Sequence, residues 1–259
     1  MFSRTIRVVL ITYLASGAVW AANEPFVGEW KLNPSKSKLT DQMKVERVAD
    51  DKYAFDFGGG SAETIAPDGT DQPGLAGTTL SVTIEGPDSW KVVRKQEGRV
   101  LLTAYWKLSK DGDTLTDDFT QFGPKGSSTN VKYVYNRTAG TSGFAGTWES
   151  ASETLNSVYV IEVQPYQGDG LSFVNSSQGV TRNVTFDGKD HPLAGPNAPA
   201  GATSSARRVS ERTLEITTKF GDKVASTQED ALSSDGKTLT MTAHAAGRTT
   251  PSVLVFERQ

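Results

Sequence analysis

Apolar and polar residues alternate along most of the chain, which is the pattern of β-strands with one buried face. Residues 213–220 show it well, because Leu214, Ile216 and Phe220 share one face while polar side chains occupy the other. Residues 238–244 repeat the pattern. The alternation predicts half-buried antiparallel strands, and no long amphipathic helix is expected beyond the first residues.

Turn signals separate these runs about every eight to twelve residues. Many are Asp-Gly pairs, as at Asp68-Gly69, Asp111-Gly112 and Asp187-Gly188. Glycine accepts the positive φ of a tight hairpin, so neighbouring strands are expected to pair directly. The runs predict about eight or nine strands in each half. We favour up-and-down barrels because closure removes exposed sheet edges, with a β-sandwich for each half as the alternative.

The same landmarks occur twice in the same order, so the chain is a tandem repeat. The matching pairs are Gly28-Glu29-Trp30 with Gly146-Thr147-Trp148, residues 108–116 with 232–240, and Arg137 with Arg258. The boundaries expected from these landmarks are a barrel at 22–138, a small, flexible linker at 139–143 and a second barrel at 144–259.

The first residues have the features of a secretory signal peptide. Arg4 and Arg7 precede an apolar run that is too short for a comfortable transmembrane helix, and small residues precede a cleavage site after Ala21. A signal peptide at 1–21 predicts a periplasmic or secreted protein with no transmembrane segment in the mature chain. The chain has no cysteine, so neither disulfides nor a lipid-attachment cysteine are expected.

The charge of the chain bears on its partners. The formal net charge is −3, and neither half is basic. This argues against nucleic acid or an anionic membrane surface as the main partner. No calcium-loop pattern or histidine pair with zinc-ligand spacing occurs, so we expect no metal site and no cofactor.

The repeated Gly-x-Trp and arginine residues predict how each barrel closes. A barrel brings its first and last strands together, so a terminal guanidinium can lie across the tryptophan face. Within each half, this pairs Arg137 with Trp30 and Arg258 with Trp148. We interpret these four residues, with Gly28 and Gly146, as structural framework.

These paired motifs resemble the framework signature of the lipocalin and wider calycin superfamily. The resemblance spans both halves, and the repeated Asp-Gly segments are similar to lipocalin-like domains of exported bacterial proteins. It implies antiparallel barrels that are open at one end and often hold a small apolar molecule. The chain departs from the family in its short halves, and no helix is expected after either barrel.

Aromatic residues on the predicted strands are candidates for lining a ligand cavity. Tyr105 and Trp106 are adjacent, so they face opposite sides of a strand and one of them can lie where the halves meet. Two segments rich in proline and glycine, 73–77 and 191–201, are expected to be lids over a barrel mouth. The candidate ligand-binding residues are Trp90, Tyr105, Tyr159, Phe173 and His191.

No catalytic set is expected from the sequence. His191 lies beside Asp187 and Asp190, but no partner nucleophile accompanies it, and Gln72 occupies the equivalent place in the first half. The leading hypothesis is an exported, non-enzymatic binder of a small apolar or amphipathic molecule. The alternative is a structural or surface-interaction module that displays loops such as 191–201 to an envelope partner or polysaccharide. An enzyme centred on His191 is a third option.

Overall fold

The computed structural model describes residues 24–58 and 61–259, so the predicted signal peptide at 1–21 lies outside the described residues. Almost all regular structure in this part of the chain is β-strand. The exceptions are three short 3-10 turns, η2 (Pro34–Lys36), η3 (Leu75–Gly77) and η4 (Pro124–Gly126). In the described ranges, no helix has the length and apolar character needed to cross a membrane.

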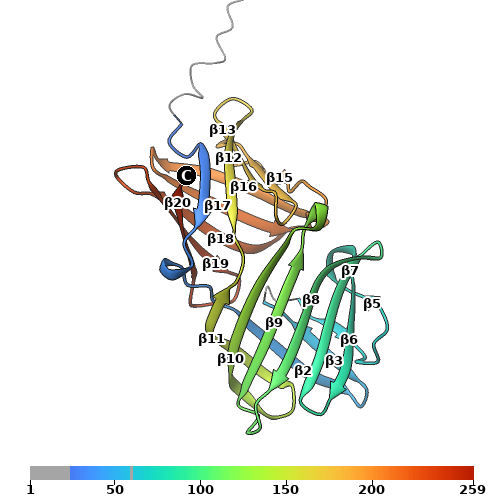
Figure 1. Ribbon diagram of the computed structural model, residues 1–259. Helices are drawn as coiled ribbons and strands as arrows, with labels where there is room; N and C mark the ends of the chain where they lie inside the picture. Colours follow the sequence, from blue (N-terminus) through green and yellow to red (C-terminus); the bar gives the residue numbers. More distant parts are fainter. Residues whose placement is uncertain (1–23, 59–60) are drawn as a thin grey trace, which may run out of the picture.

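The strands form two antiparallel sheets of ten strands, each curled into a nearly closed barrel (Figure 1). The first barrel has the spatial order β4 (Glu63–Ile65), β3 (Lys52–Asp56), β2 (Gln42–Ala49), β11 (Ala145–Leu155), β10 (Ser128–Ser142), β9 (Thr114–Phe122), β8 (Arg99–Leu108), β7 (Ser89–Gln96), β6 (Thr79–Gly86), β5 (Gln72–Pro73). The second barrel has the order β14 (Val180–Val184), β13 (Gly170–Asn175), β12 (Val160–Tyr166), β1 (Gly28–Leu32), β20 (Ser252–Arg258), β19 (Thr238–Ala245), β18 (Lys223–Leu232), β17 (Thr213–Phe220), β16 (Ala202–Ser210), β15 (His191–Pro192).

The predicted all-β class and the two antiparallel barrels are therefore confirmed. The strand number is higher than the eight or nine expected from turn signals, because each sheet has ten strands. Strands β5 and β15 contribute two residues each. Strands this short show no alternation, so sequence periodicity gives no sign of them.

The two repeats exchange their first strands. Strand β1 pairs with β12 and β20 of the second barrel, whereas β11 pairs with β2 and β10 of the first. In Figure 1 the blue β1 accordingly lies among the yellow and red strands. The sheets therefore do not follow the expected boundaries at 22–138 and 144–259, since each half gives its first strand to the other barrel.

The cause of the exchange is the connection between the repeats. The expected flexible linker at 139–143 is instead mostly the end of β10, which turns tightly at Gly143 and returns as β11. Hairpin pairing places Arg137 opposite Trp148 and adds β11 to the first barrel. The second barrel is then completed by β1, the only first-repeat strand that the structure describes in that sheet.

The framework arginines stack on tryptophan as expected, but with exchanged partners. The guanidinium carbon of Arg137 lies 4.1 Å from the ring centroid of Trp148, and that of Arg258 lies 4.2 Å from Trp30. The predicted pairing of Arg258 with Trp148, and of Arg137 with Trp30, is wrong. Glycine at position 28 suits this contact, because its φ of +146° is one that other residues rarely adopt and a Cβ would lie 2.6 Å from Nη1 of Arg258.

Each barrel has a seam where its two edge strands meet. In the first barrel, the side-chain amide of Gln72 accepts from the backbone N–H of Ala66 (2.9 Å) and donates to its carbonyl (2.7 Å). In the second, Thr181 and Ala194 exchange two backbone hydrogen bonds. Both seams are thus closed by polar contacts between short strands and loops.

Each barrel is filled by its own apolar core. The second is built around residues such as Trp30, Leu214, Ile216 and Phe256, and the first around Trp90, Trp106 and Trp148 among others. Phe220 departs from the predicted inward face and is 44% exposed, because it is the last residue of β17. The alternation thus identifies inward positions along strands but fails at their rims.

Candidate ligand-binding site

The interior of the first barrel contains a cavity of about 270 Å³. An apolar protein cavity of about 150 Å³ holds benzene, so this one has room for a single-ring molecule. Alternate residues of β7, β8, β9 and β10 point into it because successive side chains of a strand face opposite sides. The lining residues are Asp41, Met43, Phe57, Leu80, Val92, Arg94, Leu102, Ala104, Trp106, Asp117, Phe119, Tyr133 and Tyr135.

Most of this lining is apolar or aromatic. Trp106 is buried and packs near Phe57, with ring centroids 6.1 Å apart, and Tyr133 packs near Tyr135 at 5.6 Å. Aromatic rings provide a large contact area, and their faces attract cations. The cavity is therefore shaped for a small, largely apolar molecule.

Asp117 is the unusual polar residue of the cavity. It is 6% exposed, and its Oδ1 has no hydrogen-bond partner in the described part of the chain. Nε1 of Trp106, the cross-strand neighbour of Asp117, also lacks a hydrogen bond of standard geometry within the same ranges. Burial raises the pKa of Asp117 to about 7; the indole N–H of Trp106 opposes the rise, and the charges of Asp41 and Asp118 add to it.

A second acid, Asp41, stands in a connected polar chain. The hydroxyl of Tyr135 donates to Oδ2 of Asp41 at 2.6 Å, and Nη2 of Arg248 lies 2.7 Å from Oδ1. Burial, followed by the charges of Asp41 and Asp117, raises the pKa of Tyr135 far above its usual value, so this hydroxyl stays a donor. The negative charge of Asp41 is thus balanced by Arg248, and its carboxylate also accepts a hydrogen bond from Tyr135.

Arg248 comes from the second barrel, in the loop between β19 and β20. Besides Asp41, it donates to the backbone carbonyls of Thr40, Gln42 and Phe57. Its side chain is 14% exposed. The second barrel therefore supplies a cation beside the cavity of the first.

Arg94 is the other cation at the cavity, and it is also paired. Its Nη1 and Nη2 donate to both carboxylate oxygens of Glu63, at 3.0 and 2.6 Å, and Nη1 also donates to Thr78. The Glu63 carboxylate additionally accepts from the backbone N–H of Leu75. The predicted lid 73–77 is thus anchored at the seam of the first barrel by this bidentate pair.

The second barrel also has a buried acid in the pair of facing residues that corresponds to Trp106 and Asp117. There the acid lies on the first strand of the pair instead of the second. Trp106 of β8 faces Asp117 of β9, whereas Asp230 of β18 faces Met241 of β19. Burial raises the pKa of Asp230 to about 6, although a hydrogen bond from Gln228 and the positive charge of Arg182 oppose the rise. The charge of Arg182 therefore partly offsets the burial of Asp230, and no cation has a corresponding effect on Asp117 in the described part of the chain.

A further hollow of about 330 Å³ lies where the barrels meet. Its walls include the exposed apolar side chains of Leu75, Phe220 and Val224, with Lys223 as the charged residue of its lining. It contains none of the buried, unpartnered polar atoms found among the described residues. The cavity inside the first barrel, unlike this hollow, therefore has a buried polar group without a partner in its lining.

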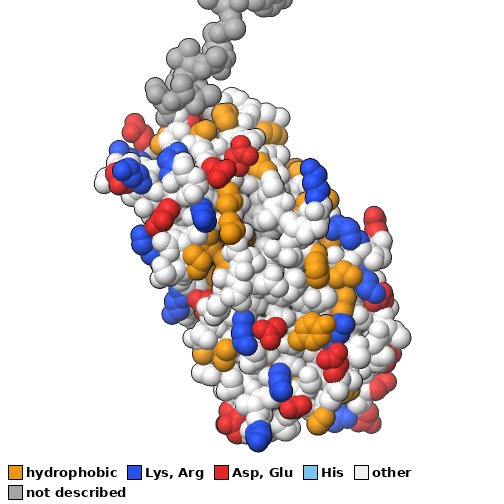
Figure 2. Space-filling model, viewed as in Figure 1, with side chains coloured by type: hydrophobic (Ala, Val, Ile, Leu, Met, Phe, Trp, Pro, Cys, Tyr) orange, Lys and Arg blue, Asp and Glu red, His pale blue; other side chains and the backbone are white. Residues whose placement is uncertain are grey.

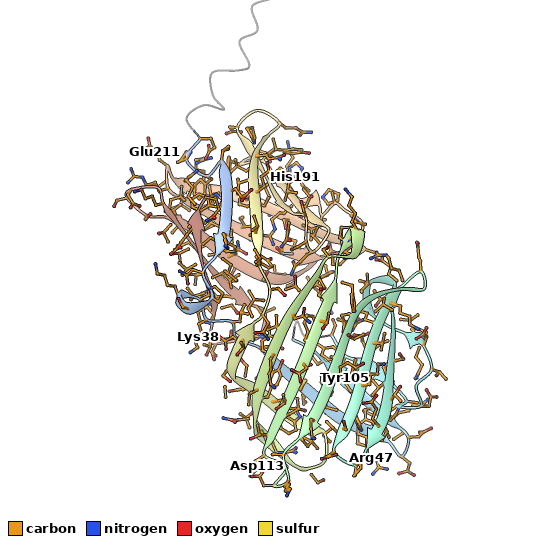
Figure 3. The ribbon with its side chains drawn as sticks, viewed as in Figure 1. Lys38, Arg47, Tyr105, Asp113, His191 and Glu211 are labelled. Carbon is orange, nitrogen blue, oxygen red and sulfur yellow. The ribbon has the colours of Figure 1, made fainter. Side chains whose placement is uncertain are left out.

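The candidate ligand-binding residues from the sequence are dispersed rather than gathered in one site. Trp90 packs in the core of the first barrel, stacked on Phe144 at 4.2 Å, and does not line the cavity. Tyr105 is 44% exposed on the outer face of β8, where it lies under Lys91 (Figure 3). Phe173 is in the core of the second barrel, and Tyr159 packs against that core.

His191 also lies in the second barrel (Figure 3). Its Nε2 is 2.8 Å from Oγ1 of Thr185, and its ring packs edge-on against Tyr166. It occupies the seam, as Gln72 does in the first barrel. The cavity of the first barrel does not include it.

The residues that sequence reasoning missed are Asp41, Asp117 and Arg248. Asp117 had a readable signal, because it shares the inward face of its strand with Leu115 and Phe119 and is therefore an acid at an apolar position. Arg248 had none, because its contact with Asp41 depends on how the barrels are placed.

No protein-family model matches the chain, and no curated protein matches it either. Within 24–58 and 61–259, no group of three or more histidine, cysteine, aspartate or glutamate side chains is arranged to hold a metal ion. Figure 2 shows charges of both signs interspersed over the face in view.

Proposed function

We propose that the protein is an exported, non-enzymatic binding protein that holds a small amphipathic molecule inside its first barrel. The observation that carries the proposal is the cavity of about 270 Å³ lined by aromatic side chains and one unpartnered acid. Ligand pockets are mostly apolar with a few placed polar groups, and this cavity has that composition. Its volume favours a single-ring molecule over a long-chain lipid.

We also propose that both barrels are lipocalin-like. The support is the stacking of each terminal arginine on a Gly-x-Trp tryptophan, which is the arrangement that the sequence resemblance implies. The exchanged first strands leave this framework intact in each barrel. Export rests on the signal-peptide pattern of residues 1–21.

The alternative, a module that displays loop 191–201, receives less support. Asn197 of this loop is buried, donates to the carbonyl of Phe122 (2.8 Å) and accepts from Arg99. Part of the surface of this loop is thus buried in the contact between the barrels. A partner would have to displace these contacts or bind around them.

Filling the cavity tests the binding proposal. We expect 2-phenylethanol, which has a single ring, to bind the wild type in isothermal titration calorimetry and to perturb tryptophan fluorescence through Trp106. Leu102→Trp, which places a large side chain in the cavity, is expected to weaken this binding at least tenfold. Leu254→Trp is the matched control, because Leu254 is also a partly buried leucine but packs against the core of the second barrel.

Circular dichroism must first show that both variants keep their strands. If Leu102→Trp binds the probe as tightly as Leu254→Trp does, the cavity is not the binding site. Native mass spectrometry of protein purified from an exporting host gives an independent reading. Retention of a small organic molecule by the wild type and its loss from Leu102→Trp is the expected result.

A further inference from the structure

We propose that the polar end of the ligand is a protonated amine, and that the carboxylate of Asp117 pairs with it. The inference rests on the proposed function, because it names the class of molecule that the cavity holds. The class is a small arylalkylamine, with its ring among the aromatic side chains and its ammonium group at Asp117.

The first argument is the balance of charge around the cavity. Asp41 is paired with Arg248 and Glu63 with Arg94, each within hydrogen-bond distance. Three acids either line the cavity or pair with a residue of its lining, namely Asp41, Glu63 and Asp117. Of these three, only Asp117 has no cation within 4.0 Å in the described ranges. A ligand cation would remove this imbalance.

The second argument is the surroundings of Asp117 on every side. Across the sheet it faces Trp106 of β8 and Tyr133 of β10, both neutral groups. Within the barrel, the charge of Asp41 disfavours a second negative charge on Asp117. Arg94 lines the same interior and already donates to the carboxylate of Glu63. Arg248 lies beside the cavity and already donates to Asp41 and to backbone carbonyls. An anionic ligand would therefore meet an uncompensated acid and two occupied cations.

The third argument is the chemistry of the walls. Trp106, Tyr133 and Tyr135 present aromatic groups in the same cavity lining as Asp117. Aromatic faces attract ammonium groups, particularly where water is excluded. Charge-assisted hydrogen bonds to a buried carboxylate are stronger than those between neutral groups. An ammonium group attached to a small ring satisfies both features together.

Protonation of Asp117 gives the proposal a pH signature. Its pKa of about 7 leaves a large fraction neutral at pH 5.5 and most of it ionised at pH 8. An alkylamine, with a pKa near the lysine value of about 10.4, stays protonated across this range. Amine binding is therefore expected to strengthen as pH rises from 5.5 to 8, while binding of a neutral alcohol is not.

Three probes of similar size and different charge test the inference. These are 2-phenylethylamine, 2-phenylethanol and phenylacetate, titrated into the full-length mature protein by isothermal titration calorimetry at both pH values. At pH 8 we expect the amine to bind at least tenfold more tightly than the alcohol, and phenylacetate most weakly. At pH 5.5 the advantage of the amine over the alcohol is expected to shrink severalfold.

Asp117→Asn removes the charge with little change of shape, and Asp118→Asn is the matched control. Asp118 is the next residue of β9, and its side chain is 59% exposed. Asp117→Asn is expected to abolish the preference for the amine while retaining alcohol binding, and Asp118→Asn is expected to retain both. The pH dependence of the wild type provides the same test if Asp117→Asn does not fold.

The outcomes separate the two proposals. If the alcohol binds the wild type but the amine binds no better at pH 8 and shows no pH dependence, the amine inference is overturned and the binding proposal stands. Tightest binding of phenylacetate would also overturn the inference. If no probe binds and no small molecule is retained in native mass spectrometry, the proposed function itself fails.

Discussion

Arg258 lies across the indole of Trp30, although these residues stand near opposite ends of the described chain. The guanidinium also donates to the carbonyls of Val27, Pro25 and Gly236, so it ties the segment before β1 to the turn between β18 and β19. The exchanged strand β1 is therefore held against its neighbour β20 in the middle of the second sheet.

Removing this arginine should weaken the second barrel. We expect Arg258→Ala to lower the free energy of unfolding by about 1–3 kcal/mol through lost stacking and unpaired carbonyls. Chemical denaturation followed by circular dichroism measures the effect. An Arg258→Ala protein that unfolds at the wild-type denaturant concentration would contradict the assigned role.

A double-mutant cycle tests the identity of the partner. Arg258→Ala should couple to Trp30→Leu by at least about 0.5 kcal/mol, because these side chains touch. Its effect should be additive with Trp148→Leu within about 0.5 kcal/mol, because Trp148 stacks on Arg137 instead. Coupling to Trp148 with none to Trp30 would mean that the first strands are not exchanged.

The strand exchange also predicts which fragments fold. Residues 38–157 contain β2 to β11 in one continuous stretch, whereas residues 22–138 lack β11 and carry β1 without its neighbours. We expect the first fragment to give dispersed amide signals in NMR spectra and the second to aggregate or give collapsed signals. Equal folding of both fragments would be incompatible with the observed sheet order.

Buried acids should make stability depend on pH. The pKa values of Asp117 and Asp230 are raised to about 7 and about 6, above the ordinary value of 3.8, so the folded state retains protons that the unfolded state releases. These groups stabilise the fold fully below pH 3.8, and their contribution falls as pH rises to about 7 and then levels off.

Asp117→Asn should therefore remove part of the loss of stability that accompanies rising pH. Without ligand, we expect its unfolding free energy relative to that of the wild type to rise between pH 5 and pH 8 by on the order of 2 kcal/mol. Denaturant titrations at several pH values measure the difference. Asp118→Asn is the control that keeps most of the wild-type slope, because the charge of Asp118 is the smallest of the contributions to the pKa of Asp117. If the curves of Asp117→Asn and the wild type are parallel, Asp117 of the folded protein does not titrate between pH 5 and pH 8.

Arg248 should couple the two barrels. Arg248→Gln leaves Asp41 without its cation and removes donors to three backbone carbonyls, so we expect a loss of about 2 kcal/mol. Arg207→Gln is the control, because the Arg207–Glu215 pair is largely exposed and should contribute under about 1 kcal/mol. Calorimetry is expected to resolve separate unfolding of the barrels in Arg248→Gln. Equal effects of the two substitutions would remove any special role for Arg248.

Local patterns in the sequence account for much of the fold. Alternating residues such as Leu214 and Ile216 are buried as predicted, because the two-residue period of a strand fixes which side chains share a face. Asp111-Gly112 and Asp235-Gly236 lie between successive paired strands, because a hairpin needs only its own turn residues. The arginine-on-tryptophan framework was also predictable, although its partners were not.

The sequence by itself determined the β class, the repeat, the inward faces and the chemistry of the framework residues, since each follows from local periodicity and residue type. Tertiary structure alone decided that Trp30 lies with Arg258, because the first strand of each repeat contains Gly-x-Trp and a short hairpin at Gly143 selects which barrel receives each copy. It also decided that Asp117 lies unpaired beside an aromatic cavity while Arg248 neutralises Asp41. Such pairings depend on long-range geometry, which alternation along a single strand does not encode.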